Sequence, residues 1–449
     1  MNYSLKEIAE MIGVAPPGSG APIAVSGVST DTRMLRAGEI FFALKGEHHD
    51  GDRFVQGAFD MGAAAAVTHR VHDAGPCLVA PDPLAALQRF AAAHRARCDA
   101  RVIAITGSCG KTTSKDMAAA VLGEAPGVIK TQGNLNNEIG CPLSLLKITP
   151  ETRFAVIEMG ANHMGEIERM CHVARPDESA VTLVAPSHLE GFGSIENVAR
   201  AKGEIMEALP PSGCFYVNMD DPWCRAMADG YSGEKIRYGH QGDVMLESLA
   251  FDEQGEMLLT IAPVGRLRLP LRVRAHAANV LLAIAIGLRH GITEFEEPLR
   301  KACANAARFK TMRLGDIILL DDSYNANPAS MSAALDALAD QTGGARIAVL
   351  GSMFELGVAA PGLHHELGAS VARRGLNRLV AMGPNAADMA AGAREAGLEA
   401  VDTPQCHEEA ARLIASLAKP GDLALVKGSR GMRMETIIEM LREILMAEP

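Results

Sequence analysis

Short apolar runs alternate with longer segments of helical periodicity along most of the chain. The alternation is most regular in the C-terminal third, where the apolar runs are residues 317–320, 346–350, 378–382 and 423–426. The helical segments between and after them are residues 330–339, 362–373, 386–396 and 432–445. Strands separated by helices of this length are typical of parallel βαβ units. We therefore predict a doubly wound α/β domain over residues 313–449, with ligand-binding loops at the carboxyl ends of its strands.

The first two thirds of the chain show the same alternation with more interruptions. Residues 1–98 predict a small α/β domain with strands at 25–28 and 40–44, helices at 51–61 and 84–96, and a break at Pro16–Pro22. Residues 99–312 predict a central domain with strands at 101–106, 154–158 and 180–185, helices at 114–122, 198–209 and 275–289, and a β-rich edge at 244–273. The longest apolar run, Ala277–Leu288, is shorter than the ~18 residues of a membrane span, so we predict a buried helix there. The predicted fold class is thus α/β, with three domains.

Composition narrows the class of protein. The 449 residues carry a formal net charge of −11, which argues against a general nucleic-acid binder. The nine cysteines are scattered without a CxxC pair, which is typical of reduced thiols in a cytoplasm rather than of a disulfide framework or a zinc site. Residues 1–13 have the pattern of an amphipathic helix with acidic residues, unlike a signal peptide. We expect a cytoplasmic, multidomain protein without a membrane span.

The stretch RVIAITGSCGKTTSKDMA at residues 101–118 has the order strand, glycine loop, helix. Glycines let backbone N–H groups approach an anion, and the helix N-terminus adds a favourable dipole. Lys111 can reach the β- and γ-phosphates of a nucleotide, and the Thr112 hydroxyl can bind Mg²⁺. The motif is a short form of the P-loop, because Ile105 stands where the strict pattern has its first glycine. A plain glycine-rich turn would not explain the lysine and two threonines. The predicted nucleotide-binding residues are Gly107, Ser108, Cys109, Gly110, Lys111, Thr112 and Thr113.

Three further side chains of the central domain are candidates for a site beside this loop. Glu158 ends an apolar strand, where a second Mg²⁺ ligand would lie; the alternative is a charge at a helix N-terminus. His188 follows the strand predicted at 180–185, although spacing alone favours a hydrogen-bonded loop histidine. Lys202 lies on a predicted helix, where lysine is usually solvated. In the first domain, the polar loop Lys45–Gly51 is equally compatible with ligand binding and with a solvated turn.

The chain resembles the Mur ligase family over nearly its whole length. The motifs that carry the resemblance are, in order, TGSCGKTTSK, GNLNNEIG, VIEMGANHMGEI, HLEGFGS, ARAKGEI, DDSYNANP and VKGSR. DDSYNANP is the most discriminating, because sister ligases carry other residues around that aspartate. Within the family, the chain is most similar to the branch that joins D-alanyl-D-alanine to UDP-N-acetylmuramoyl-tripeptide. The resemblance implies a UDP-sugar-binding domain, a P-loop ATPase domain and a C-terminal ligase domain, with ATP held between the last two.

The resemblance also implies roles for single residues. Thr112, Glu158 and His188 would bind Mg²⁺, and Lys202 matches a lysine that becomes carbamylated and supports a metal ion. The residues implied to contact ATP outside the P-loop are Asn279, Arg313, Asp322 and Asn325. The residues implied to bind the UDP-sugar peptide or the dipeptide are Ser29, Thr30, Asp31, Arg33, Lys45, Gly46, His49, Asp50, Asn134, Asn136, Asn137, Asn325, Asn327, Lys427, Ser429 and Arg430. The family likeness favours a monomer.

Three positions depart from the usual family pattern. Ala275 and Met312 replace a histidine and a glycine, and Ser352 replaces an aspartate. These departures bear on adenine recognition and domain closure, while the phosphate and metal positions are intact. Two alternatives therefore stay open: a sister ligase with another amine substrate, and a nucleotide-binding protein without turnover. The sequence leaves open whether the tripeptide ends in meso-diaminopimelate or in lysine.

Overall fold

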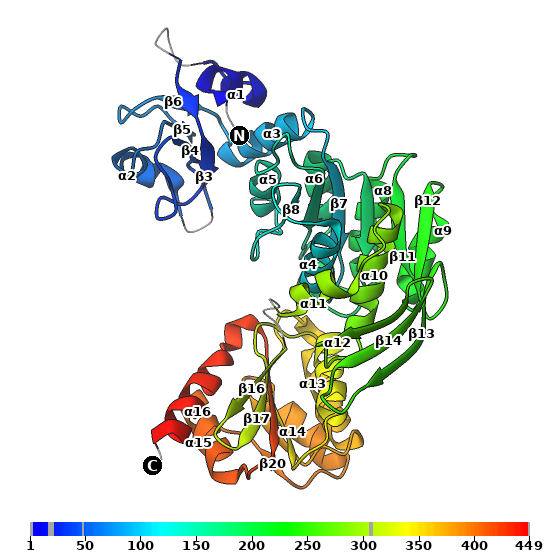
Figure 1. The fold of residues 1–449 in the computed structure, drawn as a ribbon. Coiled ribbons are helices and arrows are strands. Elements are labelled where there is room, and N and C mark those ends of the chain that lie inside the picture. Colours follow the sequence, from blue (N-terminus) through cyan, green and yellow to red (C-terminus); the bar gives the residue numbers. More distant parts are fainter. Residues whose placement is uncertain (1–2, 17–21, 47–48, 305–308, 448–449) are drawn as a thin grey trace.

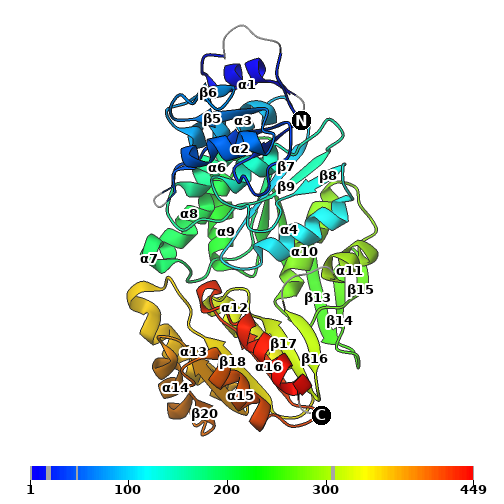
Figure 2. The same cartoon turned by 90° about the vertical axis from the view of Figure 1, so that its left-hand side faces the viewer.

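The computed structural model describes residues 3–16, 22–46, 49–304 and 309–447. The chain forms an N-terminal, a central and a C-terminal unit, each built on its own main sheet, of four, nine and six strands. Figures 1 and 2 show the central unit between the other two, so the molecule is elongated. Residues 17–21 of the predicted break and residues 47–48 of the loop Lys45–Gly51 lie outside the described residues. Within the described part of the chain, no helix combines the length and apolar character needed to cross a membrane.

The N-terminal unit contains a parallel four-stranded sheet in the order β3-β4-β5-β6. Its elements are β1 (Tyr3–Ser4), α1 (Leu5–Ile12), β2 (Ala24–Val25), β3 (Gly27–Ser29), β4 (Glu39–Phe42), η1 (Gly51–Phe54), α2 (Val55–Asp60), β5 (Ala65–Thr68), β6 (Cys77–Val79) and α3 (Pro83–Arg95). The strand predicted at 25–28 is in fact two strands. It divides at Ser26, whose backbone N–H donates to the Gly38 carbonyl, because β2 pairs with β1 whereas β3 pairs with β4.

The central unit is a nine-stranded sheet in the order β15-β14-β13-β12-β11-β10-β7-β9-β8. Its first elements are β7 (Arg101–Thr106), α4 (Lys111–Leu122), β8 (Val128–Lys130), α5 (Gly140–Leu145), β9 (Phe154–Glu158), α6 (Glu166–Ala174), β10 (Glu178–Val181), α7 (Leu189–Phe192) and α8 (Ile195–Glu207). They are followed by β11 (Cys214–Asn218), α9 (Pro222–Asp229), β12 (Glu234–Gly239), β13 (Val244–Phe251), β14 (Met257–Ala262), β15 (Gly265–Leu269), α10 (His276–Arg289) and α11 (Glu296–Ala304). The β-rich edge predicted at 244–273 is confirmed as the antiparallel strands β13–β15, and α10 is the predicted buried helix.

The strand predicted at 180–185 ends early, at Val181. Beyond it, backbone groups of Leu183 and Ala185 bond to the P-loop instead of to a neighbouring strand. The Leu183 carbonyl accepts from Ser108 N at 2.9 Å, and Ala185 N donates to Ser108 Oγ at 3.0 Å. The apolar run therefore continues as a wall of the loop rather than as sheet.

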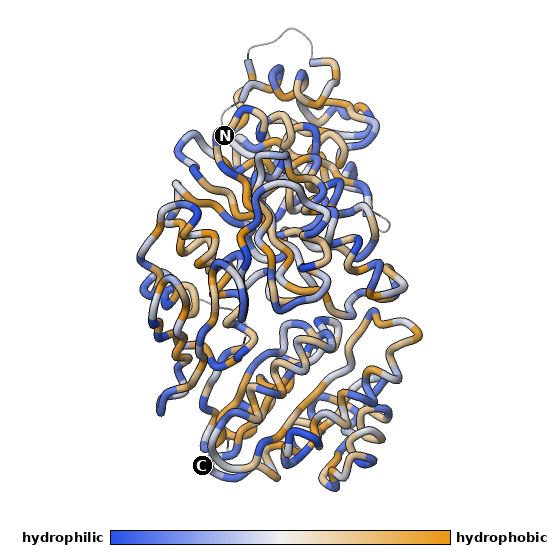
Figure 3. Tube along the Cα trace, turned by 90° about the vertical axis from the view of Figure 1, so that its right-hand side faces the viewer, coloured by the Kyte–Doolittle hydropathy of each residue, from blue (hydrophilic) through white to orange (hydrophobic). Residues whose placement is uncertain are grey.

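The C-terminal unit is a six-stranded sheet in the order β16-β17-β21-β18-β19-β20, parallel except for β16. Its elements are β16 (Lys310–Leu314), β17 (Ile317–Asp322), α12 (Pro328–Ala339), β18 (Arg346–Gly351), η2 (Gly357–Ala359), α13 (Ala360–Arg373), β19 (Arg378–Met382), α14 (Ala386–Glu395), β20 (Val401–Asp402), α15 (His407–Leu417), β21 (Leu423–Lys427), η3 (Arg430–Met432) and α16 (Glu435–Ala447). The predicted doubly wound arrangement is confirmed, with α12–α14 packed over one face of the sheet and α15–α16 over the other. Figure 3 shows hydrophobic and hydrophilic stretches alternating along the chain of this unit. The boundary predicted between 312 and 313 falls inside β16.

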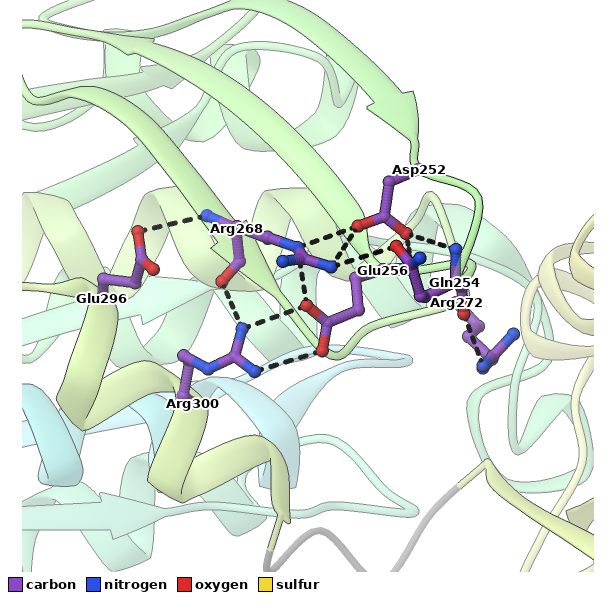
Figure 4. Close-up of polar contacts among 7 residues, drawn as sticks. All are labelled: Asp252, Gln254, Glu256, Arg268, Arg272, Glu296 and Arg300. Carbon is purple, nitrogen blue, oxygen red and sulfur yellow. Dashed lines mark hydrogen bonds and ion pairs between the residues drawn. The ribbon is translucent and has the colours of Figure 1, made fainter.

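A network of charged side chains braces the hairpin of β13 and β14, as Figure 4 shows. Arg268 on β15 pairs with Asp252 at 2.7 Å and with Glu256 at 2.9 Å. Arg300 on α11 donates to both carboxylate oxygens of Glu256, at 3.1 and 3.2 Å. The network therefore ties the hairpin turn to the next strand and to a helix.

The same edge of the central unit touches the C-terminal unit. Arg272 donates to the Gln341 side chain at 3.3 Å, and Arg274 pairs with Asp340 at 2.6 Å. Asp340 and Gln341 directly follow α12, which also reaches the nucleotide-binding loop at its other end. The braced hairpin edge is thus a second point of contact between the two units.

Glu178 is a buried carboxylate at the amino end of β10 that predicts a pH dependence of stability. Burial raises its pKa, but hydrogen bonds from His290 and Tyr216 and the charge of Arg289 outweigh this and lower the pKa to about 2. A lowered pKa in the folded state stabilises the protein above the unfolded pKa of about 4.3, and this contribution is lost as the pH falls toward 2.

We expect Glu178→Gln to destabilise the central unit by roughly 3 kcal/mol near pH 7, because it leaves buried cationic partners uncompensated. The difference from the parent should shrink between about pH 5 and pH 3. Amide hydrogen exchange of β10 and β11, followed as a function of pH, measures this difference in stability. Glu234→Gln is the matched control, because Glu234 also pairs with Arg289 but its side chain is 52% exposed. A difference that is constant with pH would contradict the assignment.

Candidate active site

A cleft of about 260 Å³ lies between the central and C-terminal units. The central unit contributes the glycine loop, the start of α4, His188 and the start of α10. The C-terminal unit contributes the loops that follow β17, β18 and β21, which is where a doubly wound sheet places its ligands. Three of the sequence motifs, TGSCGKTTSK, DDSYNANP and VKGSR, therefore meet at one place.

Two glycines allow the nucleotide-binding loop to adopt its shape. Gly107 has φ 147° and Gly110 has φ 83°, in the region that favours glycine. A Cβ on Gly107 would lie 1.9 Å from Thr182 Oγ1, and one on Gly110 would lie 2.6 Å from Asn279 Oδ1. The helix α4 begins at Lys111, three residues before the predicted start, and no side chain caps its first turn. Its N-terminal N–H groups are therefore available to an anion.

Lys111 lies over this loop. Its Nζ donates to the Gly107 carbonyl at 2.8 Å, so the cation is held where phosphates would enter the loop. Ser114 Oγ, one turn into α4, donates to Asn279 Oδ1 at 3.0 Å, and Asn279 is only 6% exposed. Asn279 thus holds α10 against the helix that follows the loop, and it also lines the cleft.

Glu158 ends β9 beside the loop and is 2% exposed. Its Oε1 accepts from Asn136 Nδ2 at 2.8 Å, whereas its buried Oε2 accepts no hydrogen bond. Lys115 Nζ lies 3.8 Å from this Oε2. A buried carboxylate oxygen without a donor is costly, and a hard divalent cation would satisfy it. The residues present therefore fit a Mg²⁺ ion at this position.

His188 and Lys202 lie on the same side of the central unit. His188 has φ 50°, and its Nδ1 hydrogen-bonds to Glu355 of the C-terminal unit. Burial lowers the pKa of His188 despite that carboxylate, so the neutral imidazole, which is the metal-binding form, is favoured. Lys202 is 2% exposed, and burial together with the charge of Lys111 lowers its pKa to about 7.

The loops of the C-terminal unit are held together by a buried lysine. Lys427 Nζ donates to Asp322 Oδ2 at 2.5 Å and to the Asn325 carbonyl at 2.9 Å. Asn325 Oδ1 accepts from Arg430 N at 3.2 Å. Asn327 caps α12 and donates from Nδ2 to the Ser108 carbonyl at 2.9 Å, across the cleft. The DDSYNANP loop thus touches the nucleotide-binding loop directly.

Comparison with known proteins identifies the family. Residues 24–94 match the description "Mur ligase family, catalytic domain", residues 105–287 match "Mur ligase middle domain", and residues 307–430 match "Mur ligase, glutamate ligase domain". The chain belongs to the Mur ligase family. Among curated relatives of this Mur ligase, the UDP-N-acetylmuramoyl-tripeptide–D-alanyl-D-alanine ligase of Escherichia coli K12 is 37% identical over 94% of this chain and 95% of its own length. The enzyme of the same name from Bacillus subtilis 168 is 34% identical over 98% of both chains.

Solved structures of Mur ligases agree with this assignment. MurF from Acinetobacter baumannii superposes with a TM-score of 0.91 at 30% identity, covering 99% of both chains. MurF from Thermotoga maritima in complex with ADP superposes with a TM-score of 0.84 at 26% identity, covering 95% of this chain and 99% of its own.

Two predicted site residues that are not among the cleft-lining residues are Arg313 and Asn137. Arg313 lies on β16 opposite Ile318, is exposed, and is not among the cleft-lining residues, so its position does not support a contact with ATP. Phe309, which precedes β16, lines the cleft. Asn137 Oδ1 accepts from Gly140 N at 2.9 Å and so stabilises the turn before α5.

The three residues that depart from the family pattern, Ala275, Met312 and Ser352, lie in different parts of the structure. Ala275 lines the cleft at the start of α10. Met312 lies on β16 opposite Leu319. Ser352 is fully buried, donates to the Met382 carbonyl at 3.3 Å and accepts from Asn385 N at 3.0 Å. Ser352 therefore fixes two loops of the C-terminal unit to each other.

The candidate residues of the N-terminal unit lie apart from the cleft. Asp31 and Arg33 form an exposed ion pair at 2.6 Å, and Ser29 Oγ donates to the Asp31 carbonyl. The backbones of Lys45 and Asp50 pair in an isolated antiparallel β-bridge, which closes the loop between them. Asn134, like Asn136, lies on the segment after β8, and Asn134 is exposed.

Two residues of the site are absent from the sequence-based set. Lys115 is 2% exposed, donates to the Thr131 carbonyl at 2.9 Å and lies beside Glu158. Lys115 is the last residue of the motif TGSCGKTTSK, so the sequence carried a signal that could have found it. Glu355 contacts His188 across 167 positions of sequence, and no local pattern marks it.

Proposed function

We propose that this Mur ligase joins D-alanyl-D-alanine to UDP-N-acetylmuramoyl-tripeptide, using ATP, and so makes the pentapeptide precursor of peptidoglycan. The observation that carries the proposal is the meeting of the nucleotide-binding loop with the DDSYNANP loop, where Asn327 Nδ2 reaches the Ser108 carbonyl at 2.9 Å. The names of the full-length relatives in Escherichia coli and Bacillus subtilis support it. The ADP complex of the Thermotoga maritima structure supports use of ATP.

The chemistry requires activation of a carboxylate, because a carboxylate is a poor electrophile for an amine. The tripeptide carboxylate attacks the γ-phosphorus of ATP, giving an acyl phosphate and ADP. The dipeptide amine then attacks the acyl carbon, and phosphate leaves from the tetrahedral intermediate while the amine loses its proton. Lys111 and the N-terminus of α4 would hold the β- and γ-phosphates, so the protein mainly positions the reactants and offsets charge.

The residues that would hold Mg²⁺ are Thr112, Glu158, His188 and carbamylated Lys202. The buried, unsatisfied Oε2 of Glu158 and the lowered pKa of His188 support this set. When bound, Mg²⁺ would neutralise charge on the phosphoryl oxygens. The neutral Lys202 amine would add CO₂ and lose one proton to form the carbamate, which turns a cation into an anion among metal ligands. A pKa of about 7 provides the neutral amine.

The remaining assignments follow from the same proposal. Asp322, Asn325, Asn327, Lys427, Ser429 and Arg430 would surround ATP and the dipeptide, and Asn279 would lie on the adenine side. The UDP-sugar peptide would contact Ser29, Thr30, Asp31, Arg33, Lys45, Gly46, His49 and Asp50, with Asn134 and Asn136 toward the peptide. The enzyme would be a cytoplasmic monomer with domain boundaries near residues 99 and 313.

The test is phosphate release from ATP with Mg²⁺, with UDP-N-acetylmuramoyl-tripeptide and D-alanyl-D-alanine added singly and together. We expect release that needs both substrates, and a product extended by the dipeptide in mass spectrometry. Release with a different amine but not with this dipeptide would favour a sister ligase. ATP binding without turnover for any amine would favour a non-catalytic protein.

A further inference from the structure

A cluster of carboxylates and imidazoles lies in the N-terminal unit, outside the cleft. Asp50 and Asp52 follow β4 at the start of η1, and His69 and His72 follow β5. Because β4 and β5 are parallel neighbours, their carboxyl ends bring these loops together. One ligand atom each of Asp50, Asp52 and His69 lies within 4.8 Å of the other two.

Two buried polar atoms of this cluster make no hydrogen bond to any residue that the structure describes. The Asp52 side chain has no exposed surface, and its Oδ1 has no hydrogen-bond partner. His69 Nδ1 is also buried and makes no hydrogen bond, although Asp52 Oδ2 is only 3.0 Å away. The unsatisfied hydrogen-bonding capacity of these buried atoms is costly, and a shared cation between the imidazole and the carboxylates would satisfy it.

The spacing of the three side chains matches that of metal ligands. Bonds of about 2.0–2.1 Å in a tetrahedral site place ligand atoms about 3.3 Å apart. His69 Nδ1 lies 3.0 Å from Asp52 Oδ2 and 3.9 Å from Asp50 Oδ1. We propose that Asp50, Asp52 and His69 form a binding site for a divalent transition metal ion of the Zn²⁺ class, with water completing the coordination.

Two neighbours define the surroundings of the site. His72 Nε2 lies 3.1 Å from Asp52 Oδ2 and orients that carboxylate from the side of the β5–β6 loop. Arg70 Nε lies 3.1 Å from the same oxygen, and its side chain is 58% exposed. Arg70 therefore competes with the metal ion for Asp52 and can move into solvent when the ion binds.

The donor set selects the kind of ion. An imidazole together with carboxylates suits Zn²⁺, Co²⁺ or Ni²⁺, whereas Mg²⁺ and Ca²⁺ prefer oxygen ligands alone. A bound ion would link the segment after β4 to the loop after β5. The site therefore differs in chemistry and in place from the Mg²⁺ site proposed beside the nucleotide-binding loop.

The test is titration of chelator-treated, full-length protein with Zn²⁺ by calorimetry, and with Co²⁺ by visible absorption, both without nucleotide. We expect saturable binding and the absorption bands of tetrahedral Co²⁺. His69→Gln and Asp52→Asn should each weaken this binding by about 10–100-fold or more. His69→Gln keeps the test valid if Asp52→Asn fails to fold, because the His69 side chain is 26% exposed.

Three further variants give the test its controls. Arg70→Ala should tighten the binding, because it removes the competing cation. His188→Gln distinguishes metal binding at the active site from binding at the N-terminal site. It should leave the Co²⁺ bands of the N-terminal site in place. His365→Gln, from an exposed pair with Glu395 at 3.0 Å, should change nothing. Binding that is unchanged in His69→Gln, or absent from the parent protein, would overturn the proposal.

Discussion

Replacing Lys202 with alanine is expected to lower ligase turnover by about 10²–10³-fold, the usual cost of removing one group that stabilises transferring charge. The expectation rests on where the side chain lies. An ammonium that is only 2% exposed, close enough to Lys111 for that charge to lower its pKa, is unfavourable as a cation. Converted to a carbamate, the same side chain becomes an anion beside a cation-binding site. Turnover with both substrates measures the loss.

Chemical rescue separates the carbamate from a purely structural lysine. Acetate or formate should restore part of the activity of Lys202→Ala, because a short carboxylate can occupy the space of the missing carbamate. Lys111→Ala is the matched control, because it also removes a lysine that lines the cleft. Short carboxylates should not restore the activity of this variant. Activity of the parent should fall in CO₂-free buffer and return with bicarbonate. Undiminished turnover in Lys202→Ala would rule the role out.

The sequence predicts this site well where its chemistry is local. The order strand, glycine loop, helix at residues 101–122 identifies the phosphate-binding loop, since only glycine is accommodated at positions such as Gly107. The alternation of strands and helices after residue 313 likewise predicts the doubly wound sheet. In both cases the signal lies in the order of consecutive segments of the chain, so no knowledge of the tertiary structure is needed.

The remaining features depend on how distant segments pack. The strand predicted at 180–185 stops at Val181, because Leu183 and Ala185 bond to Ser108 rather than to a strand. The contact of Glu355 with His188 depends on the arrangement of two units, which no local pattern encodes. The resemblance implied that Arg313 contacts ATP, but Arg313 lies on the antiparallel strand β16 and is not among the residues that line the cleft.

Breaking the pair of Lys427 and Asp322 is expected to destabilise the C-terminal unit by about 3–5 kcal/mol, because the remaining partner is left as an uncompensated buried charge. Lys427 is 2% exposed and the Asp322 side chain 14% exposed, and they are joined at 2.5 Å. Lys427→Met and Asp322→Asn should each show this loss in the hydrogen exchange of β17 and β21, the strands that carry them. The central sheet provides the internal control.

The double variant Asp322→Asn/Lys427→Met shows whether the pair contributes to stability or to the geometry of the site. Removing both charges relieves the uncompensated one, so its loss should be smaller than the sum of the single losses by about 0.5–3 kcal/mol. Catalysis should not recover in parallel, because the Lys427 ammonium also holds the Asn325 carbonyl at 2.9 Å and so shapes the loop that we propose contacts ATP. A double variant that regained stability but not turnover would show that the pair is kept for the geometry of the site. Strictly additive losses would instead mean that the two charges act independently.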